Sequence, residues 1–296
     1  MRINLAKLKK GLNFAVVKKN KKSGFGKTST IAYSQGKKEY LAGNLASDTN
    51  LLDITSEQSS LVLAVQNNDF RIDKVITLVE EINPQQVVSP LVLKILRDYE
   101  IRTGIKIRYT VIDIKGNILF DIEDINNLMS FYNPPIKPLV KTKISNISSN
   151  CINIRDTKDI KSVLNKYAVM GIERNFPTYD SATGYGTAVL TDKNNIYFSG
   201  QYSSFDKRLN LHSEMTAVLS VLMSGKNEKI THLGLVSSKF KEEPCQICGC
   251  CRQFLLELIK RCEFSIKFFC FAKDNDIYNE YLINDLISNQ WASGNL

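Results

Sequence analysis

The sequence predicts an α/β protein made of two similar layered domains, each with helices packed on a mixed β-sheet. Two observations support this fold class. The chain resembles itself when it is shifted by about half its length, and each half alternates β-branched strands with apolar-periodic helices. The chain has 296 residues, 43% of them hydrophobic, so it can bury two ordinary cores.

The repeat lies at a shift of 157 positions, where residues 40–65 align without a gap on 197–222. Identical pairs recur along this alignment. They are Tyr40 with Tyr197, Gly43 with Gly200, Ser47 with Ser204, Leu52 with Leu209, and Ser56-Glu57 with Ser213-Glu214. A shared order of features over this length favours an internal duplication over chance similarity.

The elements follow in the same order in both halves. Residues 28–43 and 186–200 each predict a strand, a turn and a strand. Helices are expected at 57–66 and 91–98 in the first half, and at 214–223 and 251–260 in the second. Residues 105–120 and 265–278 each predict a further pair of strands. Residues 131–150 are rich in proline and polar residues, so we expect domains at 1–140 and 141–296.

Composition restricts the classes of function. No run of 18 apolar residues is present, so no membrane span or membrane partner is expected. Of the seven cysteines, four fall between 245 and 251, which favours a metal site in a reducing, cytoplasmic compartment over a disulfide framework. The net charge of +9 leaves nucleic acid open as a partner. It is not favoured, because the most basic stretch, 18–27, has no stacking aromatics among its lysines.

The residues that suggest chemistry lie in the second half. His212 and Glu214 stand at the predicted start of one helix. A second helix, entered through Pro244, would bring cysteines 245, 248 and 251 near one face, since they recur every three residues. One histidine and two thiolates form a three-ligand zinc site that leaves a fourth position for water. Glu214 would move the proton of that water, and Arg252 could compensate the thiolate charge.

These residues resemble the zinc-dependent cytidine deaminase family. His-Ser-Glu at 212–214 and Pro-Cys-Gln-Ile-Cys at 244–248 match its H-x-E and P-C-x-x-C motifs, and the residues after Cys248 resemble its C-G-x-C-R-Q helix. The resemblance implies tandem three-layer α/β/α domains and hydrolytic deamination of cytidine or deoxycytidine. It also implies one Zn²⁺ per chain, and a homodimer that forms a pseudo-tetramer of domains.

The sequence leaves two choices for the pair of cysteines that would bind zinc. The proline before Cys245 favours Cys245 and Cys248 as the ligand pair, whereas the Arg-Gln after Cys251 favours Cys248 and Cys251. Cys248 is a ligand in both registers, and we prefer Cys251 to Cys245 as its partner because of the glycine that follows Cys248.

The first half lacks the ligands of such a site. It has no cysteine and no histidine, Thr55 stands where His212 stands, and Ser89-Pro90 opens the helix that replaces the cysteine helix. Glu57 persists at the position of Glu214. We therefore expect the first half to be non-catalytic and to serve as structural support.

The substrate is less well specified. The family holds ribose with an Asn-x-Glu motif, which this chain lacks, so Gln201, Ser203 and Ser213 are the candidate substrate-binding residues. Deamination of another aminated heterocycle, such as a modified nucleoside or an antibiotic, and of cytosine in single-stranded nucleic acid are the enzymatic alternatives. A non-catalytic, zinc-stabilised binding protein is the alternative of another class.

Overall fold

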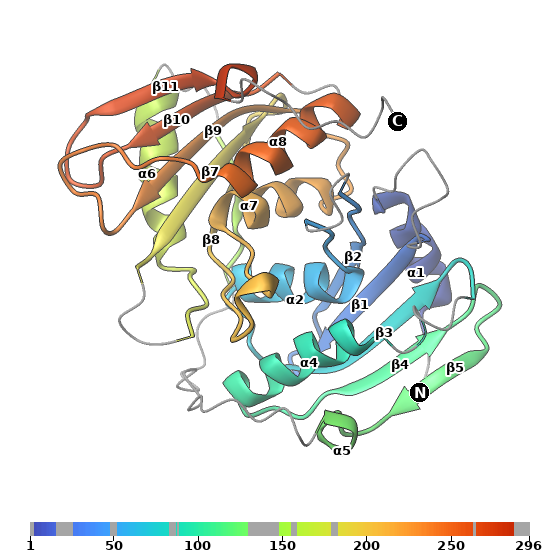
Figure 1. Cartoon of the computed structure of the whole chain (residues 1–296). Coiled ribbons are helices and arrows are strands. Elements are labelled where there is room, and N and C mark those ends of the chain that lie inside the picture. The colour runs from blue at the N-terminus through green and yellow to red at the C-terminus, as the bar shows by residue number, and fades with distance from the viewer. Residues whose placement is uncertain are drawn as a thin grey trace. The chain divides into compact units, whose positions relative to one another are not determined.

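A computed structural model describes residues 3–15, 26–47, 52–82, 87, 89–129, 148–154, 159–178, 183–262 and 265–286 (Figure 1). The chain divides into two compact units, Met1–Ile147 and Ser148–Leu296. The domain boundary predicted at residue 140 and most of the proline-rich stretch before it lie outside the described residues. In the part of the chain that is described, no helix is long and apolar enough to cross a bilayer.

The first unit is a mixed five-stranded sheet with helices. Its helices are α1 (Leu5–Gly11), α2 (Ser56–Gln66), α4 (Pro90–Thr103) and α5 (Asn126–Met129), with a 3-10 helix η1 (Leu12–Phe14). Its strands are β1 (Thr28–Ser34), β2 (Glu39–Gly43), β3 (Ile72–Val79), β4 (Arg108–Ile112) and β5 (Ile118–Ile122). The strand order is β2-β1-β3-β4-β5, and only the β3–β4 pair is parallel.

The second unit repeats this plan with one more strand. Its helices are α6 (Ile160–Ile172), α7 (Ser213–Leu222) and α8 (Gly249–Cys262), with 3-10 helices η2 (Lys207–Leu209) and η3 (Ile283–Leu286). Its strands are β6 (Cys151–Asn153), β7 (Tyr185–Thr191), β8 (Asn195–Gly200), β9 (Ile230–Ser237), β10 (Lys267–Phe271) and β11 (Tyr278–Leu282). The order β11-β10-β9-β7-β8-β6 matches that of the first unit, with β6 added at the β8 edge.

Each unit has three layers, because the two helix groups pack on opposite faces of the sheet. Side chains alternate between the faces along a strand. In β1, Ile31 packs with Leu8 of α1, whereas the neighbouring Thr30 bonds to Ser56 of α2. In β7, Ala188 packs with Leu164 of α6, and the neighbouring Thr187 bonds to Ser213 of α7. The predicted α/β class with mixed sheets is therefore confirmed (Figure 1).

Specific contacts recur in both units at the shift found in the sequence. An isolated β-bridge joins Leu45 to Ile54, and another joins Tyr202 to Leu211, so both partners are 157 positions on (45 to 202, 54 to 211). The hydroxyls of Thr30 and Ser56 are 2.8 Å apart, as are those of Thr187 and Ser213. The two units thus share the contacts that fix the loop before α2 and before α7, as well as their strand order.

Candidate metal centre

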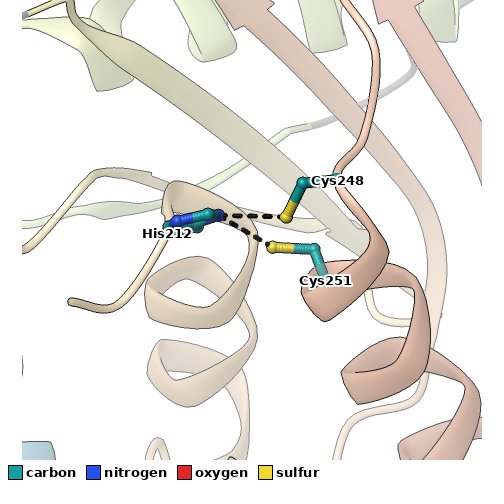
Figure 2. A group of neighbouring side chains, drawn as sticks. All are labelled: His212, Cys248 and Cys251. Atoms are coloured by element: carbon teal, nitrogen blue, oxygen red, sulfur yellow. Dashed lines mark hydrogen bonds between the residues drawn. The ribbon is translucent and has the colours of Figure 1, made fainter. Parts of the chain in front are cut away.

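The candidate site lies where the start of α7 meets the start of α8. His212 is the N-cap residue of α7, with extended backbone angles, and its side chain makes no capping hydrogen bond. Instead, its Nδ1 lies 3.3 Å from the Sγ of Cys248 and 3.3 Å from the Sγ of Cys251 (Figure 2). Cys248 immediately precedes α8 and Cys251 is its third residue. Two helix starts therefore direct one imidazole and two thiols to one point.

The expected helix through Pro244 is wrong, because α8 begins only at Gly249. The backbone N–H of Cys245 donates to the carbonyl of Phe271 and its thiol donates to the carbonyl of Leu235, 3.4 Å away. These bonds tie the segment before α8 to the end of the sheet. Cys245 is therefore bonded to the sheet, and the group of residues that could hold a metal contains Cys251 instead.

The three donor atoms fit a tetrahedral zinc ion. They all lie within 4.8 Å of one another, and in the described part of the chain the group has three members. Zinc lies about 2.1 Å from a nitrogen ligand and about 2.3 Å from a sulfur ligand, so at the tetrahedral angle the two ligand atoms are about 3.6 Å apart. The observed distance of 3.3 Å between Nδ1 and each Sγ is close to this value. Three protein ligands with a fourth position for water are typical of catalytic zinc sites, and structural zinc sites use four.

The three donor groups differ in the direction of their pKa shifts. A hydrogen bond with Cys251, followed by one with His212, lowers the pKa of the Cys248 thiol to about 3. The hydrogen bond with Cys248 raises the pKa of His212 and, together with burial, that of Cys251. The deprotonated form is therefore favoured at Cys248, whereas the raised pKa values favour the protonated forms of His212 and Cys251. A thiolate is the form of cysteine that binds metals.

Glu214 lies beside the group without belonging to it. It is the second residue of α7 and is only 3% exposed. Its Oε2 accepts a hydrogen bond from the hydroxyl of Ser213, 3.2 Å away. Burial raises its pKa, while the nearby His212 acts in the opposite direction. A carboxyl group whose pKa is raised toward neutrality can both accept and return a proton.

The candidate substrate-binding residues occupy two different environments. Ser213 is fully buried between Thr187 and Glu214, so it supports the carboxylate. Gln201 and Ser203 lie just after β8, and the Gln201 amide donates to the Ser203 hydroxyl at 3.0 Å. Between them, Tyr202 pairs with Leu211, the residue before His212. Gln201 and Ser203 are therefore carried on a segment that pairs with the residue before His212.

The expected compensation of thiolate charge by Arg252 stays a prediction, and its hydrogen bonds go to backbone carbonyls. Its guanidinium donates to the carbonyls of Ile247 at 3.1 Å and Leu286 at 3.3 Å. It thereby fixes the loop that carries Cys248.

The sequence patterns did not indicate a role for Asn175. Its side-chain oxygen accepts a hydrogen bond from the backbone N–H of Gln201 at 3.1 Å, which helps to position the segment that carries Gln201.

Comparisons with known proteins identify solved structures only. No protein-family model matches the chain, and no curated protein matches it. The cytidine deaminase of Burkholderia pseudomallei is 20% identical, with a TM-score of 0.38, over 44% of this chain and 98% of its own. That of Mycobacterium tuberculosis is 19% identical (TM-score 0.36), over 45% and 98%. That of Mycobacterium leprae is 16% identical (TM-score 0.35), over 44% and 99%.

Proposed function

We propose that the second unit is a zinc-dependent hydrolase that deaminates cytidine or deoxycytidine to the uracil nucleoside. The observation that carries the proposal is the buried Glu214 beside a three-donor group, His212, Cys248 and Cys251. A zinc ion bound there would supply Lewis-acid activation of a water molecule at neutral pH. A purely structural site would need a fourth protein ligand and no buried carboxylate beside it.

The chain's own residues perform the proton transfers. Glu214 accepts a proton from the attacking water as the water oxygen bonds to the amine-bearing ring carbon. It delivers that proton to the adjacent ring nitrogen, whose double bond to this carbon opens. It then carries the proton of the new hydroxyl to the amino nitrogen, so that the C–N bond breaks, ammonia leaves, the carbonyl forms, and water and cytidine become uridine and ammonia. Ser213, held by Thr187, donates to Oε2 of Glu214 and fixes the orientation of the carboxylate. General acid–base catalysis of this kind contributes about 10²–10⁴-fold to a rate.

A second candidate within the same chemistry is deamination of a different aminated heterocycle. It is favoured by the segment that pairs with the residue before His212, where the neutral side chains of Gln201 and Ser203 bond to each other. No carboxylate stands at these two positions to hold the hydroxyls of a ribose. The sugar, rather than the reaction, is therefore the part of the substrate that the site specifies least.

The test is product formation by the purified, zinc-loaded chain. Cytidine and deoxycytidine are supplied separately, and both the uracil nucleoside and ammonia are quantified together with the zinc content. We expect equal amounts of the two products and about one zinc per chain, as a single three-ligand site requires. One zinc per chain without either product would contradict cytidine deamination. Ammonia released only from other aminated heterocycles would replace it with the second candidate.

A further inference from the structure

The first unit contains a pocket at the position that the candidate metal centre occupies in the second. Its lining includes Asn44, Asp53, Thr55, Glu57, Ser89 and Val92. All the lining residues belong to this unit. They come from the start of β1, from the loop after β2, from the start of α2 and the residues before it, and from the start of α4 and the residue before it.

Four lining residues correspond one by one to the residues of the metal centre. Thr55 is the N-cap of α2 as His212 is of α7, and Glu57 is the second residue of α2 as Glu214 is of α7. Ser89 directly precedes α4 as Cys248 precedes α8, and Val92 is the third residue of α4 as Cys251 is of α8. The ligands have been replaced, whereas the pocket and its carboxylate remain.

The carboxylate of Glu57 is held by contacts that the second unit does not have. Its Oε1 accepts from the hydroxyls of Thr77 at 2.7 Å and Tyr109 at 2.9 Å. At the corresponding places in β9 and β10 stand Leu235 and Phe268, as the strand pairing shows. The other oxygen, Oε2, has the Ser56 hydroxyl at 3.5 Å, the outer limit of a hydrogen bond. One oxygen is thus fixed, and the other can accept from a ligand.

The lining indicates the chemistry of that ligand. Among the described lining residues, Asp53 and Glu57 carry carboxyl groups and none carries a positive charge. A phosphate would find no cation among these described lining residues to offset its charge. Leu45, Ile54, Leu91 and Val92 supply apolar walls, and the hydroxyls of Thr55 and Ser89 supply polar groups. A flat, uncharged heterocycle with N–H or O–H donors satisfies both sets of groups.

We propose that this pocket binds an uncharged nucleoside and leaves it unchanged. The choice of a nucleoside rests on the function proposed for the second unit, whose substrate would present the same amino group to the matching carboxylate. Catalysis is not expected here, because Thr55, Ser89 and Val92 cannot hold the metal that activates water. The chain would then hold two nucleosides, one of them at a site without turnover.

The experiment counts bound ligand on the full chain. Zinc-loaded Glu214→Gln, in which turnover is slowed, is dialysed to equilibrium against cytidine and, separately, cytidine 5′-monophosphate, and only samples in which the cytidine remains unconverted are counted. The same measurement is made with Val92→Phe added, and with Leu91→Trp added in its place. Leu91 is 39% exposed, so the second substitution blocks the pocket with less disturbance of the core. The exchange protection of β3 reports whether the first unit remains folded.

We expect two cytidines per chain, falling to one with either blocking substitution, and at least tenfold weaker binding of the monophosphate at the site that is lost. A fall from one to zero would support the pocket while contradicting cytidine as the ligand of the second unit. Any cytidine stoichiometry that both blocking substitutions leave unchanged, zero included, would overturn the pocket proposal. Monophosphate binding as tight as cytidine binding at the lost site would overturn its ligand class.

Discussion

Removal of the hydroxyl of Tyr109 tests how the first unit keeps a buried carboxylate without a metal. Tyr109 is fully buried, Glu57 is 3% exposed, and the bond between them is 2.9 Å long. A hydrogen bond to a charged group contributes about 1.5–3 kcal/mol. We therefore expect Tyr109→Phe to lower the free energy of opening of β3 and β4 by about 2 kcal/mol. Since about 1.4 kcal/mol is tenfold in an equilibrium, their slowest amides should exchange about 30-fold faster.

The assay is hydrogen exchange of residues 72–79 and 108–112, because one unfolding transition does not describe a chain with two units. Residues 230–237 of the second unit are the internal reference. In a Glu57→Leu background the same Tyr109→Phe should cost clearly less, since the hydroxyl has then lost its charged acceptor and keeps only its hydrogen bond with the Thr77 hydroxyl. Tyr40→Phe, which removes a donor to Asp69 instead, should cost the same in both backgrounds. An equal loss for Tyr109→Phe in both backgrounds would refute the reasoning.

Three further predictions concern the second unit. Cys251→Ser should reduce the zinc content measured by metal analysis to below half, while Cys245→Ser should leave it unchanged. The reverse result would show that Cys245 and Cys248 are the ligand pair. Removal of zinc with a chelator should lower the thermal midpoint of the second unit by several degrees and leave the exchange of β3 unaltered, because the proposed metal ligands lie in the second unit. An equal change in both units would contradict this assignment. Gly186→Ala should destabilise the second unit by about 1–3 kcal/mol or more, because the added Cβ would lie 2.0 Å from the carbonyl oxygen of Ala168. Gly249→Ala is the control, since its added Cβ meets no atom within 4 Å. Equal denaturation midpoints for these two variants would contradict the close packing of α6 on β7.

The sequence predicted most of the fold because the same hydrophobic pattern occurs twice. Helices expected at 57–66 and 214–223 are found at Ser56–Gln66 and Ser213–Leu222. The position of His212 followed from the residues themselves, since a polar residue before an apolar-periodic stretch marks a helix start. The helix ends at Leu222 with Met223 as its C-cap, and Gly225 in the turn that follows has a φ of 69°, which glycine adopts without strain.

The spacing of the cysteines could not decide which pair belongs to the candidate metal centre. Cysteines 245, 248 and 251 are equally spaced, so either adjacent pair satisfies a zinc site. What separates them is the bonding of Cys245 to the carbonyl of Leu235 and to the backbone of Phe271. These partners come from strands 10 and 26 positions away, and local periodicity carries no information about such contacts.

Local sequence patterns also could not predict the hydrogen-bond partners of Glu57. Its persistence suggested a remnant of a catalytic site, but its partners Thr77 and Tyr109 lie on two strands of the sheet. Only the register of β3 and β4 brings both hydroxyls onto the face that α2 covers. Long-range pairing, rather than propensity, therefore explains why a buried carboxylate is retained where no metal ligand remains.

The central claim is that Glu214 moves protons beside a metal held in the second unit, whereas Glu57 does not. The most direct measurement compares zinc-loaded wild type, Glu214→Gln and Glu57→Gln in one assay of uracil-nucleoside formation, with zinc quantified in each sample. We predict a loss of about 10²–10⁴-fold for Glu214→Gln at unchanged zinc content, and activity within about twofold of wild type for Glu57→Gln if its fold is retained. Undiminished turnover in Glu214→Gln, or a comparable loss in both variants, would contradict the account.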